Sequence, residues 1–171
     1  SKEKIGILMR RRFGKILSEL ARKDKKIILI VGDIGYGIFD QFRKEHPNRF
    51  FNLGICEQSI IGVAAGAALQ GLKPWVYTIT PFLIERPFEQ IKLDIDQQKA
   101  NVNLVGFADY PSLGPTHAEL NAKKLMRLMK NIKSFYPKNG SETEVLIKKT
   151  HKIVGPTFLS LKNDKDLNKN W

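Results

Sequence analysis

Short apolar runs alternate with helix-forming segments along almost the whole sequence, and this alternation limits the possible folds more than any other feature. Six runs have the length and composition of strands, and they cover residues 26–32, 49–54, 73–80, 101–107, 132–137 and 156–162. Strands that alternate with helices favour a parallel sheet with helices on both faces. The sequence therefore predicts an α/β fold, doubly wound around a mainly parallel sheet of about six strands.

The helix patterns between these runs predict where the helices begin and end. Helices are expected over residues 3–23, 57–71, 81–99, 118–131 and 141–153. Thr80 is a candidate N-cap, and Pro87 should break or kink the helix that follows it. Ser141 and Glu144 have the spacing of a capping box at the start of the last helix.

Composition adds limits on the class of protein. A chain of 171 residues with 42% hydrophobic and 27% charged residues can form one domain with a real core, here expected over residues 1–171. No apolar run reaches the length of a membrane span, so we expect no membrane partner. Cys56 is the only cysteine, which excludes an internal disulfide and a cysteine-based metal cluster. The cytoplasm is the expected compartment.

The net charge of +12, from 29 Lys and Arg against 17 Asp and Glu, is compatible with an anionic partner. However, the lysines are scattered, and no basic stripe carries interleaved aromatic residues. We therefore expect a solvated, lysine-rich surface and no nucleic-acid partner.

In doubly wound sheets, ligands bind at the carboxyl ends of the strands. This rule selects four segments as candidate site, namely Asp33, Gly54–Glu57, Thr80–Phe82 and Asp109–His117. The helix that follows Glu57 is built almost entirely from small residues, and glycine inside a helix costs roughly 1 kcal/mol relative to alanine. Close approach of another backbone would explain such a helix. That neighbour is either the chain's own sheet or a second subunit.

Three motifs in this order carry a resemblance to a known family. They are GICEQSIIGVAAGAAL from Gly54, TPFLIERPFEQI from Thr80 and GPTHAE from Gly114. Together they resemble the pyrimidine-binding domain of the transketolase family of thiamine diphosphate enzymes. The resemblance covers nearly the whole chain, from about Ile27 to Asn163.

This resemblance implies roles for six residues. Glu57 would be the catalytic acid that bonds the pyrimidine of thiamine diphosphate and drives its imino tautomer, and His117 would be the catalytic histidine near the substrate carbonyl. Phe82 and Phe88 would shape the pyrimidine slot, with Phe82 the preferred stacking ring. The remaining cofactor-binding candidates are Arg86, between the two rings, and Asp33, after the first strand. Without the resemblance, Glu57 would be a helix-start charge favoured by the helix dipole, and both rings would be core residues.

Two departures from the family pattern concern the substrate. Many sugar-processing members have an acidic residue four places before the motif histidine, where this chain has Leu113. Relatives that bind sugar phosphates commonly present an arginine near the last strand, where this chain offers only Lys162. The donor and acceptor substrates are therefore left open.

The resemblance also implies that this chain holds half of a site. Its GDIG segment is not followed by the asparagine pair of the family's metal-binding motif, so the chain is expected to lack the diphosphate-binding domain and also the C-terminal domain. A partner subunit would then hold the diphosphate and a Mg²⁺ or Ca²⁺ ion, and self-association would give a heterotetramer.

The implied function is two-carbon ketol transfer between carbonyl substrates such as sugars, by the small subunit of a split transketolase. One alternative is a thiamine diphosphate-dependent synthase that uses a 2-oxo acid donor, similar to deoxyxylulose-phosphate synthase. The other is a non-catalytic, basic α/β binding module.

Overall fold

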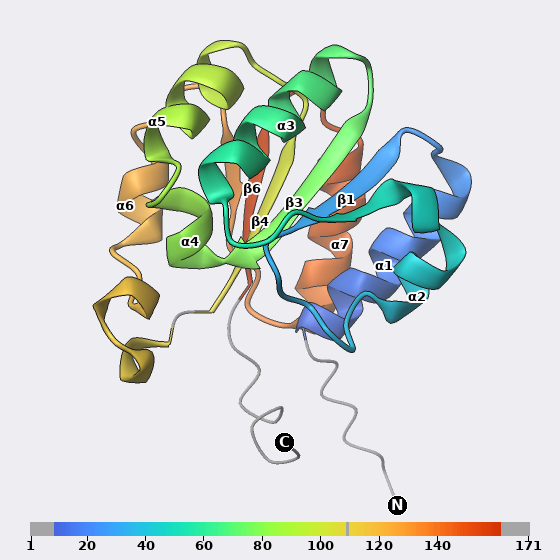
Figure 1. The fold of residues 1–171 in the computed structure, drawn as a ribbon, viewed down its shortest axis with the longest axis horizontal. Coiled ribbons are helices and arrows are strands. Elements are labelled where there is room, and N and C mark those ends of the chain that lie inside the picture. Colours follow the sequence, from blue (N-terminus) through green and yellow to red (C-terminus); the bar gives the residue numbers. More distant parts are fainter. Residues whose placement is uncertain (1–8, 109, 162–171) are drawn as a thin grey trace, which may run out of the picture.

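The computed structural model describes residues 9–108 and 110–161, and its centre is one parallel sheet of six strands (Figure 1). The strands are β1 (Ile27–Val31), β2 (Phe50–Asn52), β3 (Lys73–Ile79), β4 (Asn103–Phe107), β5 (Lys133–Phe135) and β6 (Thr157–Leu161). They lie in the order β2-β1-β3-β4-β6-β5, and every neighbouring pair is parallel. The fold class predicted from the alternation is confirmed.

The central strands are apolar because both of their faces are covered. Every residue of β1 and β4 is buried, as expected of strands inside a parallel sheet. On β3, Trp75 and Tyr77 pack into the core on one face, and Val76 packs into the core on the other. The buried Thr157 hydroxyl donates to Asn103 Oδ1 at 2.7 Å, so the polar side chains at the start of β4 and β6 satisfy each other.

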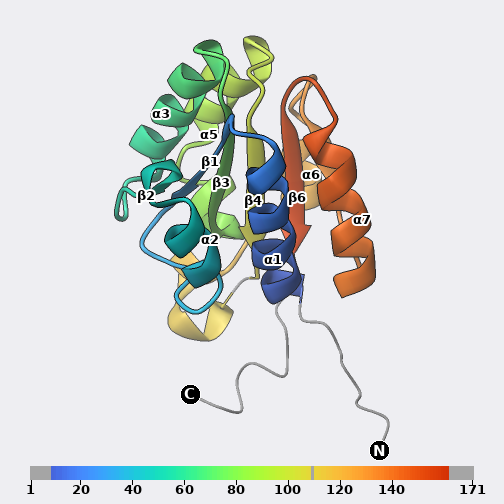
Figure 2. The same cartoon turned by 90° about the vertical axis from the view of Figure 1, so that its right-hand side faces the viewer.

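Helices cover both faces of the sheet, as Figure 2 shows edge-on. One face carries α1 (Met9–Lys23), α2 (Asp40–Glu45) and α7 (Gly140–His151). The other carries α3 (Glu57–Leu69), α4 (Thr80–Ile84), α5 (Phe88–Gln90), the π-helix η2 (Ile91–Gln97) and α6 (Ala122–Met126). Three short 3₁₀ turns complete the chain: η1 (Pro47–Arg49), η3 (Pro111–Leu113) and η4 (Pro115–His117).

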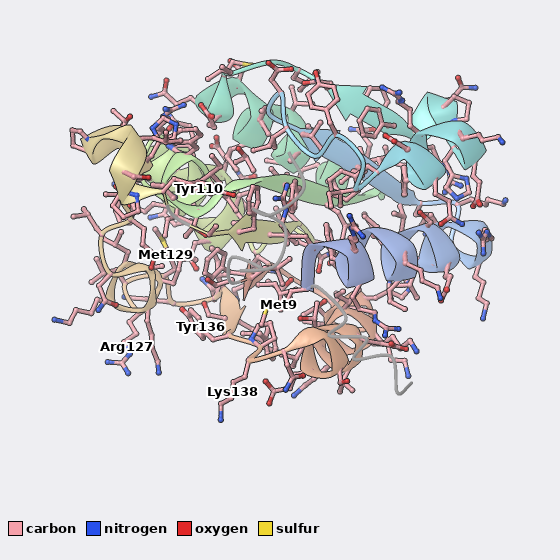
Figure 3. All side chains as sticks on the ribbon, turned by 90° about the horizontal axis from the view of Figure 1, so that it is seen from below. Met9, Tyr110, Arg127, Met129, Tyr136 and Lys138 are labelled. Atoms are coloured by element: carbon pink, nitrogen blue, oxygen red, sulfur yellow. The ribbon has the colours of Figure 1, made fainter. Side chains whose placement is uncertain are left out.

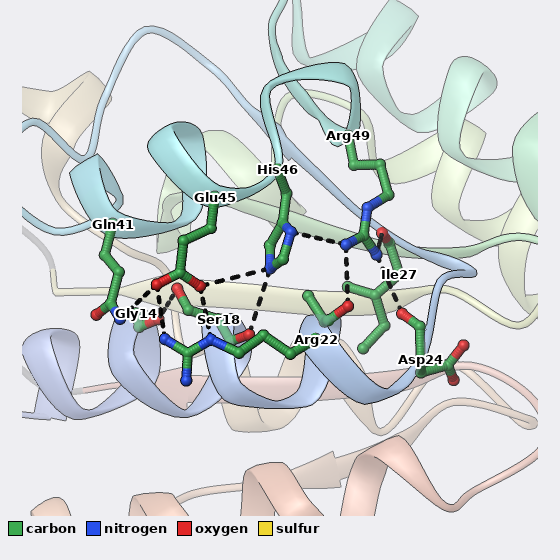
Figure 4. A network of polar contacts seen from close by, with 10 residues as sticks. Gly14, Ser18, Arg22, Asp24, Ile27, Gln41, Glu45, His46 and Arg49 are labelled. Carbon is green, nitrogen blue, oxygen red and sulfur yellow. Dashed lines mark hydrogen bonds and ion pairs between the residues drawn. The ribbon is translucent and has the colours of Figure 1, made fainter.

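A polar network fastens α2 and η1 to α1 and so fixes the β2 edge of the sheet (Figure 4). Arg22 donates two hydrogen bonds to the carboxylate of Glu45, at 2.8 and 2.6 Å. Arg49 donates to the carbonyl oxygens of Ala21 and Asp24, at 2.9 and 3.1 Å. These bonds satisfy carbonyls at the end of α1, where the helix leaves them without internal partners.

The predicted helix over residues 81–99 is broken in the structure. The chain forms α4, breaks at Pro87 as expected, and continues as α5 and η2. Thr80 is not the N-cap, because it is already the first helical residue and Ile79 takes the cap position. Thr80 packs against β4 instead, since a Cβ added at Gly106 would lie 2.7 Å from the Thr80 hydroxyl oxygen.

The last helix begins one residue earlier than predicted and is capped by different residues. Asn139 Oδ1 accepts a hydrogen bond from the Glu142 amide at 2.9 Å, and Glu142 Oε2 accepts from the Lys138 amide at 2.5 Å. Asn139 and Glu142 have the same spacing as Ser141 and Glu144, so sequence alone offered two capping frames. Glu144 is instead bound by Arg12 of α1 at 2.8 Å.

Other boundaries also differ from the prediction. The first helix begins at Met9 within the described residues, and its predicted residues 3–8 lie outside them. The helix expected over residues 118–131 shrinks to α6, where Asn121 caps the Lys124 amide at 3.0 Å. α2 was not predicted, because its six residues contribute a single buried side chain, Phe42.

Candidate active site

Glu57 is the first residue of α3 and lies at the carboxyl end of the sheet. The chain leaves β2 and turns at Gly54, where φ is +80°, a value that glycine adopts readily. Cys56 then takes the cap position without a side-chain cap, so α3 starts with its amides uncapped. Glu57 is only 5% exposed, which is rare for a glutamate.

The carboxylate of Glu57 has one partner on one of its two oxygens. Arg86 Nη1 donates to Glu57 Oε1 at 3.0 Å. Within the described part of the chain, no hydrogen bond reaches Oε2. A nearly buried carboxylate therefore offers one oxygen that can still accept a hydrogen bond from a ligand.

Arg86 also connects Glu57 to an aromatic ring. Its guanidinium carbon lies 3.5 Å from the centroid of the Phe82 ring, a close cation–π contact. The Phe82 ring in turn meets the imidazole of His117, with centroids 4.8 Å apart and the planes inclined at 67°. The structure thus brings Glu57, Arg86, Phe82 and His117 into one continuous cluster, which we call the carboxyl-end cluster.

His117 lies in a tight loop that is held by backbone hydrogen bonds. It ends η4, and its backbone amide donates to the Gly114 carbonyl at 3.0 Å, while its carbonyl accepts from the Tyr110 amide at 2.8 Å. Gly114 has φ of +105°, so the turn before the histidine suits glycine. The imidazole is half-buried, and its Nδ1 lies 3.1 Å from the Thr116 hydroxyl. Asp109, which begins the predicted loop, lies outside the described residues.

Phe88 and Asp33 have no direct contact with this cluster among the described interactions. Phe88 is half-buried and packs against the core on the α3 face of the sheet. Asp33 adopts φ of +53° after β1, and its carboxylate accepts from Tyr36 and Asn52, both at 3.2 Å.

Asn52 is a residue that the sequence reasoning missed. Its Oδ1 accepts from the backbone amides of Asp33 at 2.9 Å and Gly54 at 3.1 Å. One side chain thereby ties the loop after β1 to the turn that leads into α3. Asn52 is the last residue of β2, so the strand-end rule that selected Gly54 would have found it if applied two residues earlier.

Figure 3 looks onto the carboxyl end of the sheet and labels Tyr110, the residue whose backbone amide donates to the His117 carbonyl. Arg127, which follows α6, and Lys138 lie at the edge of the molecule farther from α3 in this view. Leu113, which stands where many relatives have an acidic residue, is 64% exposed on η3.

The described residues contain neither a metal-binding cluster nor a membrane-spanning helix. No group of three or more of their His, Cys, Asp or Glu side chains is placed to hold a metal ion. None of the described helices combines the length and apolarity needed to cross a bilayer.

A doubly wound parallel sheet with this cluster at its carboxyl end defines a class of α/β domain that binds a small molecule at the strand ends. The chain belongs to the transketolase family, since residues 6–165 match the family model described as "Transketolase, pyrimidine binding domain".

Curated relatives and a solved structure agree with this assignment. The chain is 39% identical over 123 residues to a subunit of the apulose-4-phosphate transketolase of Actinobacillus succinogenes, covering 70% of this chain and 40% of that protein. It is 33% identical over 164 residues to 1-deoxy-D-xylulose-5-phosphate synthase of Clostridium perfringens, covering 92% of this chain and 26% of that one. The structure "Split gene transketolase, inactive beta4 tetramer" superposes with a TM-score of 0.83 at 34% identity, over 92% of this chain and 52% of that chain. The chain therefore spans about half or less of the length of these relatives.

Proposed function

We propose that the chain is the pyrimidine-binding subunit of a split transketolase-like enzyme, which transfers a two-carbon ketol unit between carbonyl substrates such as sugars. The observation that carries this proposal is the state of Glu57. Its carboxylate is 5% exposed, lies at the carboxyl end of the sheet and keeps one oxygen without a partner in the described part of the chain. A family member needs such an acid to bond the pyrimidine of thiamine diphosphate.

The residues of the carboxyl-end cluster fit the pyrimidine half of this cofactor. Bound thiamine diphosphate supplies a nucleophilic carbon that can carry the two-carbon unit. Glu57 Oε2 would hold the proton that is shared with the far pyrimidine nitrogen when the cofactor is bound. Phe82, connected to Glu57 through Arg86, offers an apolar wall, and His117, in edge contact with Phe82, would hold or deliver a proton near the substrate carbonyl.

The diphosphate and its Mg²⁺ or Ca²⁺ ion would be held by a partner subunit. The apulose-4-phosphate transketolase relative is named as one subunit of its enzyme, which supports a partner for this chain as well. The solved relative is described as an inactive tetramer of β chains, which supports self-association. Two copies of this chain with two copies of the partner would make a heterotetramer.

A second candidate is a synthase that uses a 2-oxo acid donor. The match to 1-deoxy-D-xylulose-5-phosphate synthase over 92% of the chain favours it, and the exposed Leu113 removes an acidic contact to a sugar hydroxyl. Both candidates use Glu57 and His117 in the same way, so the donor substrate separates them.

Reconstitution tests the proposal. The chain is mixed with a diphosphate-binding subunit of the same family, thiamine diphosphate and Mg²⁺, and is then given either a ketose or pyruvate as donor with an aldehyde acceptor. Ketol transfer from the ketose supports the proposal, and decarboxylation of pyruvate would replace it with the synthase. If neither reaction occurs and the chain binds nucleic acid with a steep dependence on salt, the non-catalytic basic module is correct.

A further inference from the structure

Arg86 contacts the two residues that the proposed function assigns to the pyrimidine. Its Nη1 donates to Glu57 Oε1 at 3.0 Å, and its guanidinium carbon lies 3.5 Å from the centroid of the Phe82 ring. An arginine on a short, irregular segment between α4 and α5 has many rotamers available. Two simultaneous contacts restrict it to one arrangement.

The contact with Glu57 is selective for one oxygen. A guanidinium often binds both oxygens of a carboxylate in a parallel fork, and Arg22 does so with Glu45 in this chain. Arg86 instead reaches Oε1 alone, and Oε2 has no hydrogen-bonding partner among the described residues. One oxygen of the carboxylate is thereby held, and the other is left to accept a hydrogen bond.

We propose that Arg86 is a positioning residue for Glu57: it holds Oε1 so that Oε2 is aimed at the pyrimidine nitrogen of the cofactor. This inference rests on the proposed function. It gives Arg86 a role through Glu57 in place of direct contact with the cofactor.

The planar stack on Phe82 explains why arginine suits this position better than lysine. The guanidinium is a rigid plane that stacks on aromatic rings and directs its donors in fixed directions, whereas an ammonium is a compact point charge. Arg86 is 35% exposed, so its charge stays partly hydrated while its plane is fixed between Phe82 and Glu57. Phe82 therefore supports the acid through Arg86 as well as forming a wall of the slot.

A rival interpretation uses the same contacts. A flat group that donates to Glu57 and stacks on Phe82 resembles a pyrimidine ring, so Arg86 would occupy the pyrimidine's own place and compete with the cofactor. Positioning and competition predict opposite changes in affinity when Arg86 is removed.

Two ligands and one substitution distinguish them. The reconstituted complex with Mg²⁺ is titrated calorimetrically with thiamine diphosphate and with the analogue in which the far pyrimidine nitrogen is replaced by CH. A hydrogen bond to a charged group corresponds to roughly a 10- to 100-fold difference in affinity, so the wild type should prefer the true cofactor by about that factor. Arg86→Met, which keeps the apolar stem on Phe82, should lower this preference to below about threefold.

Each other outcome overturns the proposal. If Arg86→Met weakens both ligands equally and the preference persists, Arg86 does not act through Glu57. If it tightens both ligands, Arg86 is a competitor. If the wild type itself shows no preference, Glu57 does not bond the pyrimidine, and the proposed function fails together with this inference.

Two further variants serve as controls for Arg86→Met. Arg86→Lys keeps the charge without the planar stack, so it should lose an intermediate part of the preference, and it provides the same readout if Arg86→Met does not fold. Arg11→Met removes an equal charge from an exposed position on α1 and should leave both affinities unchanged.

Discussion

Glu57 has two interpretations at the scale of the single residue, and its environment favours the functional one. A carboxylate in the first turn of a helix is stabilised by the helix dipole, and such residues are normally solvated. Glu57 is 5% exposed and has Arg86 as its only hydrogen-bonding partner among the described residues. Removing a carboxylate from water is unfavourable unless its oxygens are paired, and a ligand that bonds Oε2 would supply the second partner.

Glu57→Gln should separate cofactor activation from folding. The amide is nearly isosteric and can still bond the pyrimidine nitrogen, but it cannot support the proton shift to the imino form. In the assembled enzyme, exchange of the thiazolium proton with deuterated solvent, followed by NMR, should slow by roughly 10²- to 10⁴-fold. His117→Ala should instead impair turnover more than exchange. Exchange at the wild-type rate in Glu57→Gln would reduce Glu57 to a helix-start charge.

The two aromatic candidates should respond differently to truncation. Phe82→Ala removes a ring in contact with both Arg86 and His117, so it should weaken cofactor binding in addition to the stability lost from its half-buried packing against the core. Phe88→Ala removes a half-buried ring from the core, where Phe→Ala costs up to about 3–5 kcal/mol when burial is complete. Cofactor titration and urea unfolding of both variants measure the contrast. Equal loss of affinity in both would place Phe88 in the slot as well.

At the scale of the element, α3 has two different small-residue faces. Ala64 and Ala65 are buried against the sheet, so packing within the domain explains them. Gly62 and Gly66 are exposed, and a Cβ added at either would meet nothing within 4 Å. Nothing in the described part of the chain compensates the helix for these two glycines. Packing against the chain's own sheet therefore explains the buried face, and contact with a second subunit stays a prediction for the exposed face.

Leucine substitutions on the two faces should have different effects. Gly66→Leu should stabilise the isolated chain by up to about 1 kcal/mol, because leucine is a better helix former than glycine, but it should weaken self-association, because the open face would become bulky. Ala65→Leu should destabilise the chain by about 1–3 kcal/mol through overpacking. Sedimentation and urea unfolding measure the two quantities. A Gly66→Leu chain that assembles like the wild type would show that this face is not the contact.

The link between α1 and α2 should weaken in acid. The hydrogen bonds from Arg22, and then from Gln41, lower the pKa of Glu45 from 4.5 to about 2. A lowered folded-state pKa contributes stability that is complete above about pH 4.5 and is lost as the pH falls toward 2. Glu45→Gln should therefore be less stable than the wild type at pH 6, and the difference should shrink at pH 2.

Urea unfolding at the two pH values measures this change. Glu89→Gln is a matched control on an exposed carboxylate that has no ion pair within the described residues. A Glu45→Gln difference that stays constant between pH 6 and pH 2 would show that the carboxylate does not stabilise the fold through its charge.

The sequence predicted elements well where burial sets the pattern and poorly where local hydrogen bonds set it. All six strands were found because their apolar runs are covered on both faces. The capping frame of α7 was wrong because Asn139 and Ser141 compete with equal spacing. The π-helix η2 and the short α2 leave almost no periodic signal in so few residues.

The candidate site also has a part that the sequence predicted and a part that it did not. Motif and strand-end position selected Glu57, Phe82 and His117 as candidates, and the structure places them together, while their roles stay a prediction. The single-sided bond from Arg86 to Glu57 depends on side-chain geometry across 29 positions of sequence, which no local pattern encodes.

At the scale of the whole molecule, the residues that hold the helices together are different from the residues proposed to take part in catalysis. The bonds of Arg22 and Arg49 fasten the end of α1 to α2 and η1, while the carboxyl-end cluster has an exposed Arg86 and an unpartnered Glu57 oxygen. No metal-capable group exists among the described residues. In the proposed function, another chain completes the site by holding the diphosphate and its cation.

Partner dependence is therefore the test at this scale. The purified chain alone should bind thiamine diphosphate weakly, because only Glu57 and Phe82 would hold the ligand and the diphosphate would stay in water. Adding the diphosphate-binding subunit with Mg²⁺ should restore both binding and ketol transfer, with activity rising until the two chains are equimolar. Calorimetry measures binding, and a coupled assay of the ketose product measures transfer. Glu57→Gln chains should assemble with the partner but stay inactive, which separates assembly from chemistry. Full activity in the isolated chain would mean that it holds a complete site, and the split arrangement proposed for it would be wrong.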